Sequence, residues 1–382
     1  MKILMVSIFA PHFFNWTEQL KDSGHEVYWL DVFDSNTHVE KIDFAEQITG
    51  WRYKQDFKGR YLLKSKAPKL NKLINLLNER NLTDVLEAKI KEIRPDVVHS
   101  FVIYLSGVPV LPVIEKFPEL KWILSTWGSD LFYYRKHQEY LEGIKKVLPK
   151  IDYLFTDCKR DHQIALENGF NGKFLGAFPG GGGFDLEKLE EYFLPFDERN
   201  VILIKGYQGK HGKCLEVLKA ISGLHAEIKN YELVIFGAPT EVFDYIESSK
   251  LKTWNNLQCL EKLPPEKVLQ LMGRSFMYIG NSSSDGMPNT LLEAMVMGAF
   301  PVQSNPGGAT SELIENRKNG LLIEDPFDIQ AIQGDLKEAI SGALDVKTGI
   351  AYNFENIRPL LDRNKVRKQV LEKYKLIESE LN

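Results

Sequence analysis

The residues with the clearest chemical potential are two carboxylates, Asp285 and Glu293, in the segment 281–297, NSSSDGMPNTLLEAMVM. The apolar run Phe276–Ile279 before it predicts a strand, and the small polar residues with Gly-Met-Pro predict a loop. A helical pattern follows, with its apolar residues on one side. Asp285 would therefore lie in the loop, and Glu293 about one turn inside the helix, facing the same opening.

The start of this predicted helix is suited to binding phosphate. Pro288 fits the first turn, because its missing N–H would be unpaired there anyway. A helix N-terminus carries about half a positive charge and attracts anions. The amides expected to be exposed are those of Asn289, Thr290 and Leu291. A diphosphate held between the two carboxylates would leave each acid free to bind hydroxyls, so the segment predicts a sugar-nucleotide site, with an ordinary buried helix as the alternative.

The segment resembles the donor-site motif of the retaining GT-B glycosyltransferases of family 4, E-G-x-x-x-x-x-x-E followed by A-M-A-x-G-x-P-V. Asp285, followed by Gly286, takes the place of the first Glu and is one methylene shorter, and Glu293 matches the second. The resemblance implies that Asp285 holds a hydroxyl of the transferred sugar and that Glu293 binds the ribose hydroxyls. The continuation fits at Ala294-Met295, Gly298, Pro301-Val302 and Gly307-Gly308, the last pair being either another exposed-amide turn or a plain turn.

A second loop, GYQGKHGK at 206–213, joins a predicted strand to a predicted helix. Amides exposed by glycines such as Gly206, together with ammonium groups, suit a diphosphate leaving group. The family resemblance places an Arg after the first Gly and a Lys a few residues on. Tyr207 occupies the Arg position, and Lys210 and Lys213 are both candidates for the Lys, with Lys210 preferred. A flexible surface turn with solvated lysines is the alternative.

The first half offers candidates for binding the sugar or the acceptor. Ser125–Asp130, STWGSD, resembles the family segment T-x-H-G-x-D, in which the His lies beside the transferred sugar. Trp127 replaces it, and an indole can stack on a sugar but cannot exchange protons. Ser129 and Asp130 could bind acceptor hydroxyls, while Asp130 could equally cap the following helix. Two histidines near strand ends could face the cleft or be structural, His12 and His99.

Strand runs and helical patterns alternate in the first half, which predicts a parallel sheet covered by helices on both faces. A polar loop, Ala10–Trp16, follows the first strand, at the sheet edge where ligands collect. The expected strands are Ile3–Phe9, Val27–Val32, Val97–Phe101, Trp122–Thr126 and Tyr153–Phe155, and the expected helices are Thr17–Ser23, stretches within Leu70–Ile93, and Gln138–Val147.

The second half repeats this alternation. Its expected strands are Val201–Lys205, Glu232–Phe236, Leu257–Leu260, Met277–Ile279, Pro301–Gln303 and Leu321–Ile323, and its expected helices are Cys214–Leu224, Glu241–Ser249, Pro265–Met272, one near Thr310–Ile314, and Val366–Leu381. The chain is therefore predicted to be α/β. The resemblance implies GT-B architecture, in which two doubly wound Rossmann-like domains face a central cleft.

The clearest discontinuity is Pro179–Gly183, because four consecutive glycines disfavour a regular element. We expect a hinge there rather than a phosphate cradle, since the spacing of a dinucleotide fingerprint is absent. The predicted domains are an acceptor-binding domain at 1–179 and a donor-binding domain at 180–359. The resemblance predicts that the terminal helix, within 360–382, packs back on the first domain.

The composition fits a two-domain globular protein of 382 residues with a net charge of −4. The three cysteines, Cys158, Cys214 and Cys259, are far apart, which indicates reduced thiols and a cytoplasmic location. The start MKILMVSIFA is expected to be a buried strand rather than a signal peptide. No apolar run approaches the roughly 20 residues of a membrane span.

One short stretch is strongly basic and contains interleaved aromatic residues. Such a composition can hold a protein peripherally on the inner, anionic face of a membrane, or it can be a solvated face or mobile loop. Nucleic acid is not expected, because no recognised binding module accompanies the stretch. Its basic residues are Arg52, Lys54, Lys58, Arg60, Lys64, Lys66, Lys69 and Lys72, with Trp51, Tyr53, Phe57 and Tyr61 among them and Asp56 as the acid.

These observations and the resemblance predict a retaining glycosyltransferase of glycan or polysaccharide biosynthesis. It would move a hexosyl or N-acetylhexosaminyl group from a nucleoside diphosphate sugar to a hydroxyl of a glycan or lipid-linked acceptor. No Asp-x-Asp pair stands at a strand end, so we expect neither a metal nor another cofactor. The alternatives are a sugar-nucleotide epimerase of the same architecture and, because Trp127, Tyr207 and Asp285 replace expected residues, an inactive sugar-nucleotide-binding partner.

Overall fold

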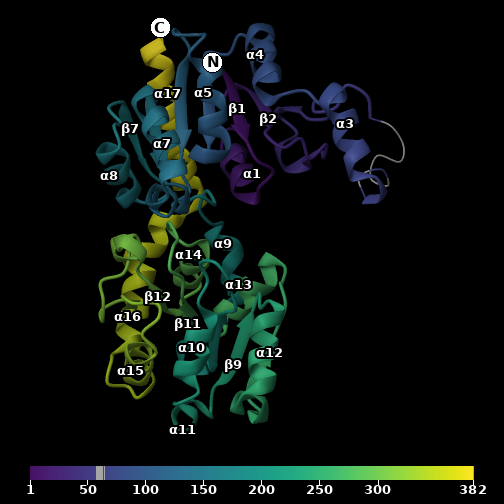
Figure 1. Cartoon of the computed structure of the whole chain (residues 1–382). Coiled ribbons are helices and arrows are strands. Elements are labelled where there is room, and N and C mark those ends of the chain that lie inside the picture. Colours follow the sequence, from purple (N-terminus) through teal and green to yellow (C-terminus); the bar gives the residue numbers. More distant parts are fainter. Residues whose placement is uncertain (57–62, 64, 382) are drawn as a thin grey trace. The chain divides into compact units, whose positions relative to one another are not determined.

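The computed structural model describes residues 1–56, 63 and 65–381, and the chain divides into two compact units (Figure 1). The first unit comprises Met1–Thr156, His162–Gly181 and Val370–Asn382. The second comprises Asp157–Asp161 and Gly182–Gln369, so one boundary falls within the glycine-rich segment. Gly183 is not loose there: its φ is +79°, and a Cβ would lie 2.7 Å from the carbonyl oxygen of Leu361.

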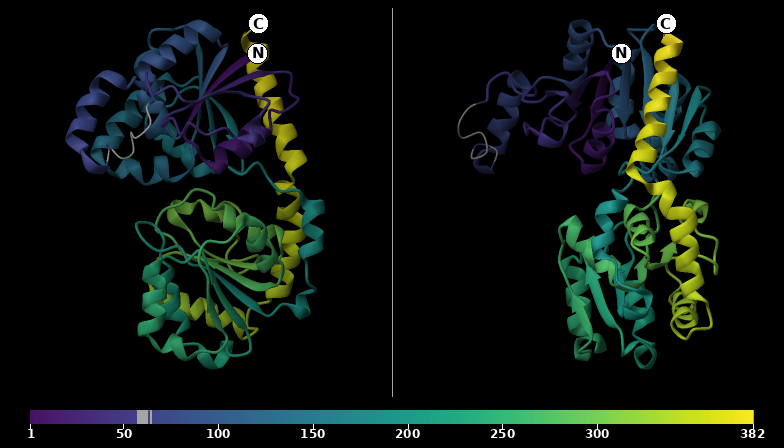
Figure 2. Two further views of the ribbon diagram at one scale, coloured as in Figure 1. Left: turned by 90° about the vertical axis from the view of Figure 1, so that its right-hand side faces the viewer. Right: turned by 180° about the vertical axis from the view of Figure 1, so that it is seen from behind.

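The first unit is built on a seven-stranded parallel sheet with the order β3-β2-β1-β4-β5-β6-β7. Figure 2 shows helices on both faces of this sheet. The strands are β1 (Lys2–Ser7), β2 (Glu26–Asp31), β3 (Glu46–Ile48), β4 (Val97–Phe101), β5 (Lys121–Ser125), β6 (Tyr153–Thr156) and β7 (Lys173–Ala177). The helices are α1 (Pro11–Glu18), α3 (Pro68–Asn78), α4 (Leu82–Ile93), α5 (Val108–Ile114), α6 (Ser129–Phe132), α7 (Gln138–Val147) and α8 (Lys159–Glu167), whose first residues belong to the second unit.

The second unit has a six-stranded parallel sheet with the order β10-β9-β8-β11-β12-β13. Its strands are β8 (Val201–Lys205), β9 (Glu232–Phe236), β10 (Leu257–Cys259), β11 (Ser275–Gly280), β12 (Phe300–Ser304) and β13 (Leu321–Ile323). Its helices are α9 (Leu186–Leu189), α10 (Cys214–Ile221), α11 (His225–Ile228), α12 (Thr240–Ser248), α13 (Pro265–Gly273), α14 (Asn289–Val296), α15 (Ile329–Ile340) and α16 (Val346–Tyr352). Both sheets reverse their strand order in the middle, which confirms the prediction of two doubly wound parallel sheets.

The last helix, α17 (Arg363–Leu381), begins in the second unit and ends in the first. Its Tyr374 is fully buried in the first unit, where the phenol accepts a hydrogen bond from the Trp16 indole at 3.1 Å. The same oxygen lies 2.8 Å from Nδ1 of His99. His99 is fully buried, and burial lowers its pKa, so of its two alternatives the structure supports a structural residue and not a group that faces a cleft.

Three local predictions fail. The expected loop Ala10–Trp16 is mostly helix α1, because Pro11 starts the helix and Phe13 and Trp16 are buried by it. The residues expected to form a helix over Thr17–Ser23 mostly form turns instead. The helix expected near Thr310–Ile314 is only a 3₁₀ turn, Thr310–Glu312. Within the described part of the chain, no helix is long and apolar enough to cross a membrane.

Candidate functional site

The donor-site candidates lie where β8 and β11 end, and these strands are neighbours in the second unit's sheet. The loops that follow them are joined through the backbone. The Lys213 N–H donates to the Asn281 carbonyl oxygen at 3.0 Å, and the Ser283 N–H donates to that of His211 at 2.9 Å. The Asn281 side chain returns a bond to the Lys213 carbonyl oxygen at 3.2 Å. Two segments that are distant in sequence therefore form one surface at the carboxyl edge of the sheet.

Gly206 shapes this surface by close packing. Its N–H donates to the Phe236 carbonyl oxygen at 2.8 Å, so this amide is not exposed as the sequence suggested. A Cβ at Gly206 would lie 2.8 Å from the backbone of Ala238, which explains why glycine is needed here. Beside this contact is a cavity of about 440 Å³ lined by Ala238, Pro239, Thr240, Phe243 and Glu261. It lies after β9 and β10, at the ligand-binding edge, and no sequence motif indicated it.

The two candidate lysines of the loop differ in orientation. The Lys213 ammonium donates to the Gly209 carbonyl oxygen at 3.0 Å and lies 5.3 Å from the Phe327 ring, so it is folded back on its own surroundings. Lys210 is exposed and acts electrostatically on Tyr207. The pKa of Tyr207 is raised by burial first and by Asp285 second, and Lys210 opposes both. Lys210 is therefore the better placed lysine for a group bound near Asp285.

Lys205, the last residue of β8, is a charged neighbour that sequence reasoning missed. Its ammonium lies 5.5 Å from the Tyr207 ring. Burial raises the pKa of Glu293 to about 7, and Lys205 is the charge that opposes this shift. A lysine at the end of an otherwise apolar strand run was the available signal. Glu293 can consequently either accept or donate hydrogen bonds to hydroxyls near neutral pH.

The start of helix α14 differs in detail from the prediction. Pro288 precedes the helix as its N-cap, with φ −66° and ψ 123°, instead of occupying the first turn. Leu291 is fully buried, and its N–H donates to the Pro288 carbonyl oxygen at 3.0 Å, so that amide is not open to a ligand. The Thr290 hydroxyl accepts a bond from buried Tyr278 at 2.8 Å. Asn289 and Thr290 stay the candidates at this helix start.

A short segment from the first half of the sequence, Asp157–Asp161, packs as part of the second unit and holds the donor-site loop. The Arg160 guanidinium donates to the carbonyl oxygens of Asp285 at 2.9 Å and Pro306 at 2.6 Å. The Met287 N–H donates to the Asp157 carboxylate at 3.2 Å. We call these contacts of Arg160 and Asp157 the Arg160 clamp. No local sequence pattern indicates it, because its partners are more than a hundred positions apart in the chain.

The clamp is itself fixed by buried charges. Arg160 pairs with Asp161 at 2.7 Å, and their side chains are 8% and 0% exposed. The backbone N–H groups of Lys159 and Arg160 both donate to the Glu312 carboxylate at 2.8 Å. A Cβ at Gly286 would lie 2.0 Å from an oxygen of Asp157, so the glycine allows this close approach. The position of the Asp285 loop is therefore set by the clamp as well as by its own strand.

Among the described residues, three side chains are close enough to hold a metal: Asp157, Cys158 and Asp161 lie with their ligand atoms within 4.8 Å of one another. They do not fit that role well. Asp161 is already paired with Arg160, Asp157 accepts the Met287 amide, and burial raises the pKa of the Cys158 thiol, which disfavours the thiolate that binds metals. The cluster is better explained as part of the clamp.

The glycine pair near the donor loop forms an ordered turn. Gly307 and Gly308 have φ values of +66° and +86°, which residues other than glycine rarely adopt. The Gly308 N–H donates to the Asn305 carbonyl oxygen at 3.3 Å, so it is used within the turn. The Gly308 carbonyl oxygen accepts a bond from Ser311 at 2.8 Å. Through Pro306, this turn is attached to the same Arg160 that holds Asp285.

The candidates of the first unit lie after β1 and β5. His12 is an exposed residue of helix α1, and its ring lies 5.7 Å from that of Trp127 in an edge-on arrangement. Asp130 is 3% exposed, and its two oxygens accept the N–H groups of Trp127 at 2.8 Å and Ile103 at 3.0 Å. It therefore fixes the Trp127 loop instead of capping the following helix from outside. Ser129 is half-buried at the start of α6.

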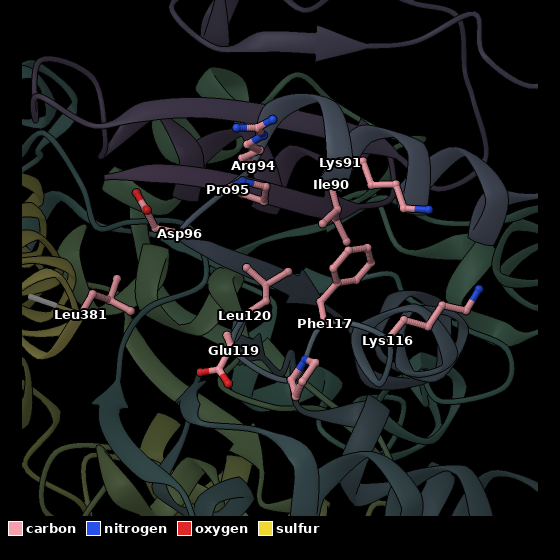
Figure 3. A pocket seen from close by; sticks show the side chains of 11 residues that line it. Ile90, Lys91, Arg94, Pro95, Asp96, Lys116, Phe117, Glu119, Leu120 and Leu381 are labelled. Carbon is pink, nitrogen blue, oxygen red and sulfur yellow. The ribbon is translucent and has the colours of Figure 1, made fainter.

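A larger pocket, of about 790 Å³, lies elsewhere in the first unit (Figure 3). Figure 3 shows the apolar side chains of Ile90, Phe117 and Leu120 among those that line it. Asp96 and Leu120 directly precede β4 and β5, so the pocket lies at the edge where these strands begin. Ligands of parallel sheets bind at the opposite edge. Its size alone therefore does not make it the candidate site.

Comparison with known proteins gives one family match in each half of the chain. Residues 187–351 match the family described as glycosyl transferases group 1, and residues 2–158 match the family described as glycosyl transferase 4-like. No protein among those of curated function matches the chain by sequence. The two matches together span both units.

The whole chain is also similar in fold to solved structures at low identity. Sucrose-phosphate synthase from Thermosynechococcus elongatus is 15% identical over 100% of both chains, with a TM-score of 0.74. HepE from Anabaena, in complex with UDP, is 15% identical over 98% of this chain and 100% of its own, with a TM-score of 0.67. A glycosyltransferase from Rickettsia africae is 16% identical over 98% of both chains, with a TM-score of 0.68.

Proposed function

Because the chain belongs to the GT-B glycosyltransferases of family 4, we propose that it transfers a hexose-type sugar, with retention at the anomeric carbon. The donor would be a nucleoside diphosphate sugar, and the acceptor would be a hydroxyl of a glycan, a polysaccharide or a lipid-linked precursor. The bond between the anomeric carbon and the diphosphate oxygen breaks, and the acceptor oxygen forms the new bond as its hydroxyl proton is released. We propose that no metal or other cofactor is required.

One observation carries the proposal: Asp285, Glu293 and the Gly206–Lys213 loop converge at the carboxyl edge of one sheet. Hydrogen bonds between the backbones of the two loops bring the segments together, and the Arg160 clamp holds the Asp285 side. This supports a site for a ligand with an anionic centre and hydroxyls on both sides of it. A nucleoside diphosphate sugar has that chemistry, and similar structures of HepE hold UDP and UDP-glucose.

In this proposal each residue has a chemical role. Lys210 and the N–H groups of Asn289 and Thr290 stabilise the departing diphosphate, which is usually the largest catalytic effect. Lys213, Gly307 and Gly308 complete the loops around it. Asp285, next to Gly286, holds a sugar hydroxyl and orients the anomeric carbon. Glu293 binds the ribose hydroxyls, for which a carboxyl group with a pKa of about 7 can both donate and accept.

The cavity beside Gly206 is our candidate for the nucleobase. It opens next to the predicted diphosphate loop, and Phe243 offers an aromatic lining while Thr240 and Glu261 offer polar groups. A base needs both a flat apolar contact and a few hydrogen-bonding partners. The acceptor and the transferred sugar are proposed to contact His12, Trp127 and Ser129 in the first unit, with buried Asp130 positioning the Trp127 loop.

A cytoplasmic protein in peripheral contact with an anionic membrane is part of the proposal. The support is the basic character of the stretch from Arg52 to Lys72. Three of its basic residues, Lys58, Arg60 and Lys64, and the aromatic residues Phe57 and Tyr61 lie outside the residues that the structure describes. Such a location would give access to lipid-linked acceptors.

The test is a binding panel of UDP, ADP, GDP and TDP with their sugar conjugates, with and without magnesium. A ligand at a hundred times its Kd should add about 2.7 kcal/mol to the free energy of unfolding. We expect one nucleotide to stabilise the protein equally with and without magnesium. Stabilisation by none of them would overturn the donor site.

Product analysis separates transfer from its alternatives. Incubation with donor and a panel of acceptors should give a glycosylated acceptor, and the anomeric configuration of the product reports retention. A new sugar or sugar nucleotide formed from donor alone would indicate an epimerase. Donor binding without turnover for any acceptor would indicate an inactive binding partner, for which Tyr207 and Trp127 at the expected Arg and His positions would be the explanation.

A further inference from the structure

Helix α3 (Pro68–Asn78) has its apolar side outward. Leu70, Leu73, Leu76 and Leu77 are 51%, 65%, 73% and 79% exposed. They are four of the ten large apolar side chains that are exposed in the described part of the chain. Leu70, Leu73 and Leu77 have the i, i+3, i+7 spacing of one helix face, and Leu76 adjoins it. A surface helix normally turns such a face toward the core, so this one is arranged for contact with something else.

The opposite face of α3 is polar and attaches the helix to its own unit. Asn71 is the buried residue of the helix, whose eleven positions are all described. The Asn78 side chain accepts from the Gln55 N–H at 2.9 Å and donates to the Gln55 carbonyl oxygen at 2.8 Å. The Lys54 ammonium donates to the Leu77 carbonyl oxygen at 2.9 Å. The leucines are therefore exposed in a helix that is fixed in place, not in one that has lost its partner by fraying.

Positive charge surrounds the leucines. Lys66, Lys69 and Lys72 are exposed, and the sequence 68–78, PKLNKLINLLN, contains no acid. At a helical period of 100° per residue, Lys69 falls on the leucine side and Lys72 borders it, while Lys66 lies just before the helix, whose N-cap is Ala67. The next acid along the chain, Glu79, is paired with Arg52. Lysine stems can lie along an apolar contact while their ammonium groups reach an anionic layer.

We propose that α3 docks on an anionic lipid bilayer, with the leucine face in the boundary between headgroups and acyl chains and the three lysines on lipid phosphates. This deepens the proposed peripheral membrane contact, on which it rests, by naming the surface. The helix is about 16 Å long, which is too short to span a bilayer and suits a position in the interface plane. A second copy of the chain fits less well, because its own lysines would meet these in a face-to-face contact.

The full chain is tested by sedimentation with vesicles of phosphatidylcholine alone and with 30 mol% phosphatidylglycerol. We expect binding to the anionic vesicles, weakened by salt, and little binding to the neutral ones. Amide exchange over 66–78 should slow when the anionic vesicles are present. Because this second measurement needs no substitution, it does not depend on how well any variant folds.

Two double variants identify the surface. Lys69→Gln with Lys72→Gln should weaken vesicle binding about 30-fold. Leu73→Asn with Leu77→Asn should weaken it on the order of 100-fold, since two apolar side chains no longer leave water. The matched controls are Lys229→Gln with Lys262→Gln, exposed lysines of the second unit, and Leu166→Asn, an exposed leucine of α8. The controls should bind like the unchanged protein.

The other outcomes overturn the inference in distinguishable ways. Absence of binding to either vesicle would remove both the peripheral contact and its assignment to α3. If the α3 variants still bind the anionic vesicles like the unchanged protein, the peripheral membrane contact would stand but α3 would not be its surface. Concentration-dependent dimers that the leucine variant abolishes, with no vesicle binding, would show that the face joins two copies. Donor-induced stabilisation should be unchanged in all these variants, so failure here is separate from failure of sugar transfer.

Discussion

The candidate residues of the second unit lie in two loops that are hydrogen-bonded to each other, whereas the candidates His12 and Trp127 of the first unit meet through their aromatic rings. The two loops proposed to bind the donor share backbone hydrogen bonds, and Arg160 bridges Asp285 and Pro306. In the first unit, the Trp127 N–H donates to the Asp130 carboxylate, and the Trp127 ring meets that of His12 edge-on. A diphosphate needs charges and amides at fixed positions, while an acceptor sugar can be held by stacking. We therefore expect that loosening these loops of the second unit lowers donor affinity more than changing the aromatic pair lowers acceptor affinity.

The largest effect should come from breaking the clamp. Arg160→Ala leaves Asp161 buried without its ion partner, which should lower the free energy of unfolding by about 3–5 kcal/mol. The Asp285 loop also loses its attachment, so donor KM should rise and amide exchange at Met287 should accelerate. Urea unfolding and donor titration measure these effects.

Arg317→Ala is the matched control for Arg160. Its side chain is 50% exposed, and its ion pair with Asp335 should contribute less than about 1 kcal/mol. Arg160→Lys keeps the charge and should restore much of the stability but less of the donor affinity, because an ammonium cannot reach both carbonyl oxygens in the same way. Unchanged stability and an unchanged donor KM in Arg160→Ala would show that Arg160 does not hold the Asp285 loop.

The next effect concerns the sugar contact itself. Asp285→Ala should reduce the rate of transfer by about 100-fold or more, with unfolding nearly unchanged, because the half-buried side chain contributes little to the core. The control is Asp197→Ala, whose side chain is 82% exposed near Lys347. Transfer at the unchanged rate in Asp285→Ala would exclude Asp285 from the mechanism.

Glu293 gives the donor region a dependence on pH. Its pKa is raised from 4.5 to about 7, so the folded protein holds a proton that the unfolded chain releases earlier. The free energy of unfolding should therefore fall as pH rises from about 4.5 to 7, relative to Glu293→Gln, by about 2 kcal/mol after allowance for partial solvent exposure. Urea unfolding of both proteins at pH 5 and pH 8 measures this difference. An equal pH response of the two would show that Glu293 is not held in a desolvating environment.

A smaller difference should separate the two lysines of one loop. Lys210→Ala should lower the rate of transfer about tenfold, because its exposed side chain acts on the same Tyr207 as Asp285 does, and a cation there stabilises the departing diphosphate. Lys213→Ala should lower it less, since that ammonium is bound to the Gly209 carbonyl oxygen. The two variants are controls for each other. A larger loss of transfer rate in Lys213→Ala than in Lys210→Ala would show that Lys213 stabilises the departing diphosphate.

Elements with a clear local pattern could be predicted from the sequence, and elements with a brief or mixed pattern could not. The strands β4, β8, β9 and β13 were predicted to the residue, because buried parallel strands are mostly apolar runs. The short edge strands β3 and β7 and helix α1 were missed, since their patterns are brief or mixed. The family resemblance is shown by the comparisons with both units.

Contacts over long sequence distances could not be predicted. Glu293 and Asp285 lie within one continuous motif, so spacing alone suggested them. Arg160 and Asp157 reach the same loop only through tertiary packing, and Lys205 matters because β8 happens to lie beside β11. The outward leucines of α3 were equally hidden, because a helical pattern indicates an apolar face but not which way it points.

The smallest predicted effect tests the first unit's side of the comparison. Trp127→Leu removes the ring that could stack on the acceptor or the transferred sugar, so acceptor KM should rise about fivefold, while Trp127→Phe should keep most of the affinity. Stabilisation by the nucleoside diphosphate should be the same in both variants, because the donor loops are held within the second unit alone. Loss of nucleotide stabilisation in Trp127→Leu would show that donor binding draws on both units. In that case the aromatic pair of His12 and Trp127 would belong to the donor site, and the division between a fixed donor region and an adaptable acceptor region would no longer hold.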